Sequence, residues 1–130
     1  MSVIDEVEAE KQFLAACPSF EAPLKEFRAE WMEGQPSLFN VLVELARHLA
    51  RLLQAGRTSE IVATLGVVER AIAGGNDAVV HAATHGLLTS LQWEAKDCGL
   101  DPEVFVGDLG PATWNWWNDL TKNWEAGKGW

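Results

Sequence analysis

Residues 36–55 read PSLFNVLVELARHLARLLQA, and this stretch decides the fold. Its leucine and valine side chains recur at spacings of three and four, which is the period of one face of an α-helix. The apolar face is wide, because Phe39, Val43 and two alanines extend it beyond a single stripe. A polar stripe lies opposite and consists of Glu44, Arg47, Arg51 and Gln54. We therefore expect a central helix over this range that contacts neighbours on two sides.

Prolines and glycines divide the rest of the chain into further helical segments with short connections. The expected helices lie at about residues 4–16, 19–33, 58–73 and 78–98, with a short turn at 102–106 and a last helix at 111–126. In the first helix, the stripe expected to face inward consists of Ile4, Val7, Lys11 and Leu14, with Phe13 beside it. Gly34, Gly56 and Gly99 are expected to end helices.

No segment alternates apolar and polar residues over a useful length, so strands are not expected. Connections of two to five residues make successive helices antiparallel neighbours. The prediction is an all-α, single-domain irregular bundle of about five to seven helices, made of antiparallel helical hairpins, with a HEAT-like stack as the regular alternative. The domain is expected to span residues 1–130, with residues 1–3 and 127–130 frayed.

Charge is distributed unevenly along the chain. The formal net charge is −9, and residues 1–33 hold eight acids against three bases. Residues 34–93 hold four of each, whereas residues 94–130 hold seven acids against three bases. Such a surface repels phosphate backbones, so we expect neither nucleic acid nor an anionic membrane as a partner. It favours a basic protein partner, although solubility alone also accounts for an acidic surface.

The N-terminus is acidic and lacks the basic and apolar regions of a secretory signal, so a cytoplasmic protein is expected. Cys17 and Cys98 have no metal-ligand spacing and are interpreted as free thiols, with a disulfide or a metal role as the alternative. Of seven tryptophans, five lie at or after Trp114. Trp117 and Trp124 are expected to dock the last helix, whereas Trp116 and Trp130 are the expected exposed rings.

Asp77, His81 and His85 are the residues with the most metal-like spacing, because they recur one turn apart. No glutamate follows His81 to act as a general base, and no further ligand is evident, so a polar helix face is the other interpretation. His48 follows Glu44 by one turn, and the two are expected to interact locally. No phosphate-binding glycine loop or activated nucleophile is recognised, so we expect no cofactor and no enzyme activity.

Three segments together resemble an uncharacterised bacterial family of small helical domains. They are Phe13–Phe20 with its Cys-Pro-x-Phe element, Leu42–Leu49 with Val68–Arg70, and Leu109–Pro111 followed by Trp116, Trp117 and Trp124. The resemblance covers about residues 10–125. Proteins similar to this family are often encoded beside polymorphic toxins, so the resemblance implies an immunity protein that occludes the active site of a toxin. Electrostatic steering toward a basic toxin is compatible with the acidic charge.

The resulting hypothesis is a non-catalytic protein-binding module, with a metal-binding protein or small metal-dependent enzyme at Asp77, His81 and His85 as one alternative. A self-associating adaptor that forms a homodimer is the other. The residues expected to bind the basic partner are Glu26, Glu30, Glu33, Asp97, Asp101, Glu103, Asp108 and Trp116.

Overall fold

The computed structural model describes residues 3–32 and 34–125 and confirms the all-α bundle. In chain order the elements are α1 (Glu6–Ala16), η1 (Pro18–Phe20), α2 (Glu21–Glu30), α3 (Leu38–Gln54), α4 (Ser59–Gly74), α5 (Asp77–His81), η2 (Ala82–Leu88), α6 (Thr89–Asp97), η3 (Pro102–Asp108) and α7 (Pro111–Glu125). Of the ends expected to fray, only Val3 lies among the described residues, and it is exposed. No helix in these ranges combines the length and apolar composition that a membrane crossing requires.

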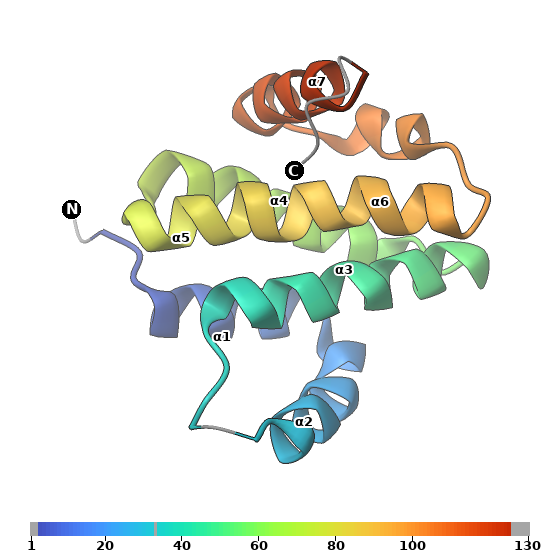
Figure 1. Ribbon diagram of the computed structural model, residues 1–130. Coiled ribbons are helices and arrows are strands. Elements are labelled where there is room, and N and C mark those ends of the chain that lie inside the picture. Colours follow the sequence, from blue (N-terminus) through green and yellow to red (C-terminus); the bar gives the residue numbers. More distant parts are fainter. Residues whose placement is uncertain (1–2, 33, 126–130) are drawn as a thin grey trace.

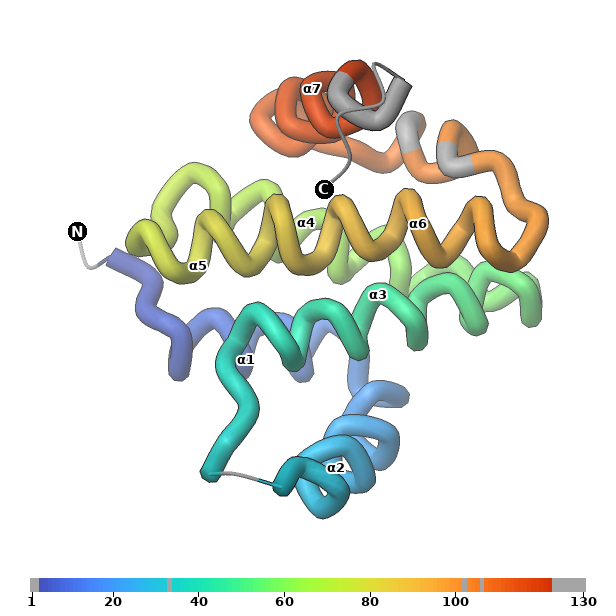
Figure 2. The backbone as a smooth tube through the Cα atoms, in the orientation of Figure 1, coloured from blue at the N-terminus to red at the C-terminus, as the bar shows by residue number. Residues whose placement is uncertain are grey.

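The central helix α3 packs against one long helix formed by α5, η2 and α6 in succession (Figure 1). α1 packs on α4, and α4 in turn packs on α7. α2 lies at one edge of the molecule, whereas η3 and α7 lie at the opposite edge, as the chain path in Figure 2 also shows. The two edges are therefore separated by the layer that contains α3 and the long helix.

Local signals explain where most helices begin and end. Ser37 and Asn76 cap α3 and α5 by accepting hydrogen bonds from backbone N–H groups of the first turn. Gly56 and Gly99 have φ of 74° and 77°, which confirms the left-handed stops expected after α3 and α6. The glycine at each position is needed because other residues are strained in this conformation.

The first helix begins at Glu6, two residues later than expected, because Ile4 is used for a tertiary link. Its N–H donates to the carbonyl of Gly74 at 2.8 Å, and its carbonyl accepts from the N–H of Asn76 at 3.0 Å. This isolated parallel bridge attaches the N-terminal segment to the turn between α4 and α5. Asp5 then caps α1 by accepting from Glu8 N–H.

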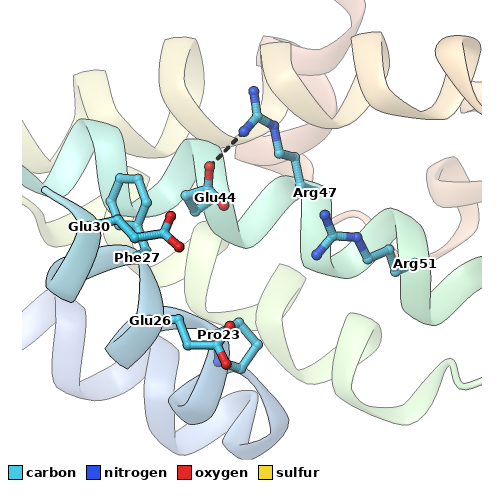
Figure 3. Close-up of a pocket in the computed structure, with 7 residues that line it drawn as sticks. All are labelled: Pro23, Glu26, Phe27, Glu30, Glu44, Arg47 and Arg51. Atoms are coloured by element: carbon cyan, nitrogen blue, oxygen red, sulfur yellow. Dashed lines mark hydrogen bonds and ion pairs between the residues drawn. The ribbon is translucent and has the colours of Figure 1, made fainter.

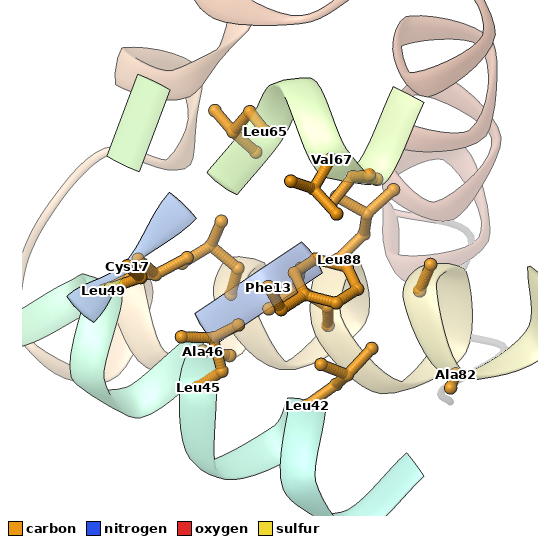
Figure 4. Close-up of a cluster of buried hydrophobic side chains, with 14 of the residues drawn as sticks. Phe13, Cys17, Leu42, Leu45, Ala46, Leu49, Leu65, Val67, Ala82 and Leu88 are labelled. Carbon is orange, nitrogen blue, oxygen red and sulfur yellow. The ribbon is translucent and has the colours of Figure 1, made fainter. Parts of the chain in front are cut away.

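The inward face of α1 also differs from the expected stripe. Ala9 and Phe13 are buried, whereas Val7 is 66% exposed. The periodicity of α1 is weak, so the large Phe13 side chain determines which face packs. Ile4 and Leu14 of the expected stripe are partly buried against the core. The ring of Phe13 lies among buried side chains of α3, α4 and η2 (Figure 4). Those labelled in the figure are Leu42, Leu45, Ala46, Leu49, Leu65, Val67, Ala82 and Leu88.

Candidate partner-binding groove

A groove of about 250 Å³ lies between α2 and α3 (Figure 3). Its lining residues are Pro23, Glu26, Phe27 and Glu30 of α2 and Glu44, Arg47 and Arg51 of α3. On each helix these residues recur at spacings of three and four, so each set occupies one helical face. The groove therefore has one acidic wall, with Phe27 and Pro23 beside the acids, and one wall that carries two arginines.

Only part of the charge in this groove is neutralised within the protein. Arg47 binds Glu44 at 2.7 Å and Glu94 at 3.1 Å, which ties α3 to α6. By contrast, Glu26, Glu30 and Arg51 make no hydrogen bond or ion pair with any other residue that the structure describes. Glu26 and Glu30 are exposed, so their carboxylates are available to a partner.

The turn that precedes α2 is held in place by a cluster of polar side chains. Ser19 Oγ lies 2.7 Å from His48 Nε2 of α3, and Ser19 N–H donates to Glu60 of α4 at 3.0 Å. Burial lowers the pKa of His48, so the neutral imidazole can accept the hydrogen bond of the Ser19 hydroxyl. The hydrogen bond from Ser19 N–H likewise lowers the pKa of Glu60. The cluster therefore fixes the orientation of α2 relative to α3 and α4.

His48 thus has a partner that lies 29 residues away, and the expected local pair with Glu44 does not form. Glu44 binds Arg47 instead, because that guanidinium lies one turn away on the same exposed face. Cys17 is buried next to Ser19, and Cys98 is partly buried; both are free thiols, as expected. Burial raises the pKa of Cys17 to about 11, with the Glu60 carboxylate adding to the shift.

The residues expected to bind a partner do not form one surface. Glu26 and Glu30 line the groove at the α2 edge, and Glu33 lies outside the described residues. Asp97 ends α6 and lines a hollow of about 210 Å³ together with Trp93 and Lys96. Glu103 and Asp108 are exposed on η3 at the opposite edge, where Asp101 accepts a hydrogen bond from Glu103 N–H (Figure 1).

The tryptophans of α7 differ in part from expectation. Trp117 is buried, as predicted for a ring that docks the helix. Trp116, however, is only partly exposed because its ring contacts His85, whereas Trp114 is 46% exposed. The side chain of Trp124 and the whole of Trp130 lie outside the described part of the chain.

The alternative metal site at Asp77, His81 and His85 does not form as a set of three ligands. Among the residues with described positions, no three His, Cys, Asp or Glu side chains are grouped so that they could hold one ion. The two imidazoles do lie together, with ring centroids 5.0 Å apart.

Sequence reasoning missed Ser19 and Glu60, and it recorded Arg51 only as part of a polar stripe. The polar stripe of α3 was a usable signal for the groove wall, because its period was visible in the sequence. The link from Ser19 to His48 had no such signal, since it joins two separate segments of the chain.

One family model matches the chain, over residues 10–125, and its description is a domain of unknown function. No curated protein and no solved structure matches the chain.

Proposed function

The chain belongs to the DUF7674 family, and from the groove described above we propose that it is a non-catalytic protein-binding module of the immunity type. In this proposal it binds a basic toxin in the cytoplasm, and the bound module blocks access to the active site of the toxin. The α2 edge is the contact surface.

The observation that carries the proposal is the state of the α2 carboxylates. Glu10, Glu44, Glu60 and Glu94 all form ion pairs within the protein. Glu26 and Glu30 are exposed, have no partner in the described residues, and lie one turn apart beside Phe27. Carboxylates next to an aromatic ring are suited to an interface in which a cationic side chain is desolvated.

The net charge of −9 supports the same partner class, because long-range attraction accelerates encounter with a basic protein. Salt screens this attraction, so binding is expected to weaken as ionic strength rises. Ser19 and His48 hold the start of α2 against α3, so the acidic wall is ordered before a partner arrives. Preorganisation reduces the entropy lost on binding.

The test uses the products of the reading frames that flank the gene for this chain. Each product is expressed alone and together with the chain, and growth and complex formation are measured. We expect one basic product to inhibit growth and the chain to relieve the inhibition through a salt-sensitive complex. The paired substitution Glu26→Lys with Glu30→Lys should weaken the complex by about 2 kcal/mol or more, since it places like charges at the contact.

A matched control is available at the opposite edge. Glu103→Lys with Asp108→Lys changes the net charge by the same amount on η3 and should leave the affinity nearly unchanged. If both double substitutions weaken binding equally, the affinity depends on the net charge alone and the α2 edge is not the contact surface. If no flanking product is toxic and none binds, the immunity proposal fails.

A further inference from the structure

The helix that carries both His81 and His85 is not a regular α-helix. Residues Ala82–Leu88 form a π-helical segment between α5 and α6, and Gly86 lies within it. A Cβ atom at Gly86 would lie 3.3 Å from both the ring and the carbonyl oxygen of Phe39, so glycine allows Phe39 to approach closely. Short π-helical segments are unfavourable and are frequent at functional sites. His85 lies within this segment, and His81 directly precedes it.

Four aromatic rings form a row along this segment. Phe39 stacks on His81 with 5.2 Å between ring centroids, and the centroids of His81 and His85 lie 5.0 Å apart. The rings of His85 and Trp116 are nearly perpendicular, with centroids 5.7 Å apart. Both histidines are exposed. Within the described residues, the ring nitrogens of neither histidine take part in a hydrogen bond or an ion pair.

The separation of the two imidazoles matches that of two ligands on one ion. With metal–nitrogen bonds of about 2 Å and a near-tetrahedral angle, two imidazole centroids on one ion lie about 5 Å apart. The observed distance is 5.0 Å. We infer that His81 and His85 form a two-histidine chelate for a late first-row divalent transition-metal ion, whose remaining coordination positions are open to solvent.

The surroundings of the pair favour a cation. Glu6 and His81 line the same groove of about 350 Å³, and the exposed Asp77 lies one turn before His81. Imidazole selects zinc, nickel and copper, and does not select the hard cations magnesium and calcium.

The flanking rings act as positioning residues. Phe39 and Trp116 contact opposite ends of the histidine pair, so they restrict the side-chain torsions of both ligands before a metal arrives. Residues that orient metal ligands commonly change metal affinity when they are replaced. The site uses none of the residues of the α2–α3 groove, so a test of metal binding does not depend on whether the proposed partner binds.

Imidazole ¹⁵N NMR spectra of the full-length protein, recorded during titration with Zn²⁺, test the chelate directly. We expect the ¹⁵N resonances of one ring nitrogen of His81 and one ring nitrogen of His85 to shift over the same range of Zn²⁺ concentration. His48, whose ring is bonded to Ser19, should not shift and serves as the control within the same spectrum. Titration with Mg²⁺ should shift none of the three. A shift at only one of the pair, or at neither, overturns the inference.

Calorimetric titration with Ni²⁺ separates the ligands from the positioning residues. His81→Asn and His85→Asn should each remove the chelate, whereas Phe39→Ala and Trp116→Ala should weaken binding about tenfold. Trp114→Ala is the matched control, because this exposed indole of α7 contacts neither histidine in the described structure. Unchanged affinity in the His81 and His85 variants would contradict the site, and equal losses at Trp114 and Trp116 would contradict the positioning role.

Discussion

Glu69 shows how a single side chain joins distant parts of this fold. Its carboxylate accepts hydrogen bonds from the N–H of Ala112, the N–H of Thr113 and the hydroxyl of Thr113, so a residue of α4 caps the start of α7. Gly110 leaves room for this carboxylate, because an added Cβ atom would lie 2.6 Å from the carboxyl carbon of Glu69 and displace it from the cap. Burial alone would raise the pKa of Glu69, but these hydrogen bonds outweigh it and lower the pKa.

Replacing Glu69 with alanine is therefore expected to destabilise the protein, although the residue lies in neither proposed site. The loss of a helix cap costs about 1–2 kcal/mol in free energy of unfolding, measured by urea denaturation. Glu26→Ala is the control, since an exposed carboxylate without a described partner should change stability by less than about 0.5 kcal/mol. Equal stability of the two variants would show that Glu69 does not cap α7.

At the scale of the element, most helix termini were predicted correctly, but α2 ends at Glu30 and not at Gly34 as expected. Helix faces were predicted less well. Gly56 and Gly99 end helices because the required backbone conformation is a local property. The buried face of α1 was predicted only in part, since Phe13 fills a space that α3, α4 and η2 create together and Val7 is exposed. The π-helical segment could not be predicted either, because its sequence has an ordinary helical period and the distortion fits the contact between Gly86 and Phe39.

Replacement by alanine should change stability in opposite directions at two glycines, one inside α4 and one directly after it. Gly66 lies inside α4, and the nearest atom to an added Cβ is the end of the Arg70 side chain at 3.9 Å, so Gly66→Ala should stabilise the protein by up to about 1 kcal/mol. Gly75 follows α4, and an added Cβ would lie 2.5 Å from the carbonyl oxygen of Ala71. Gly75→Ala should therefore lower the melting temperature, and a rise in both variants would contradict this packing.

For the whole molecule, the pKa shifts predict that the free energy of unfolding decreases on both sides of neutral pH. The pKa values of His48 and His85 are lowered by burial, so the folded state binds fewer protons than the unfolded state. Their contribution is complete above the ordinary value of about 6.5 and is lost as the pH falls through the lowered folded values. The pKa values of Glu60 and Glu69 are also lowered, so their contribution to stability is lost below about pH 4.5.

The pKa of Cys17 is raised, so its contribution to stability changes with pH in the opposite direction. The protonated thiol contributes its full stabilisation below the ordinary thiol pKa of 9.0. This contribution is lost as the pH rises toward the folded-state pKa of about 11. Urea denaturation from pH 4 to 11 at constant ionic strength should therefore give a maximum between about pH 7 and 9. Cys17→Ser should remove the alkaline loss, and a wild-type curve that keeps rising above pH 9 would contradict the shift.

The sequence by itself determined that the chain forms helices, where most of them stop, that its thiols are unpaired and that its acids gather toward the two ends. These properties depend on helical period, on glycine conformation and on composition, all of which act over a few residues. Only the tertiary structure decided that α2 and η3, which carry acids of the two stretches, lie at opposite edges, that Ser19 meets His48, and that Phe39 and Trp116 flank the histidine pair. Such contacts join segments far apart in the chain, and the packing of one helix on another determines which residues meet.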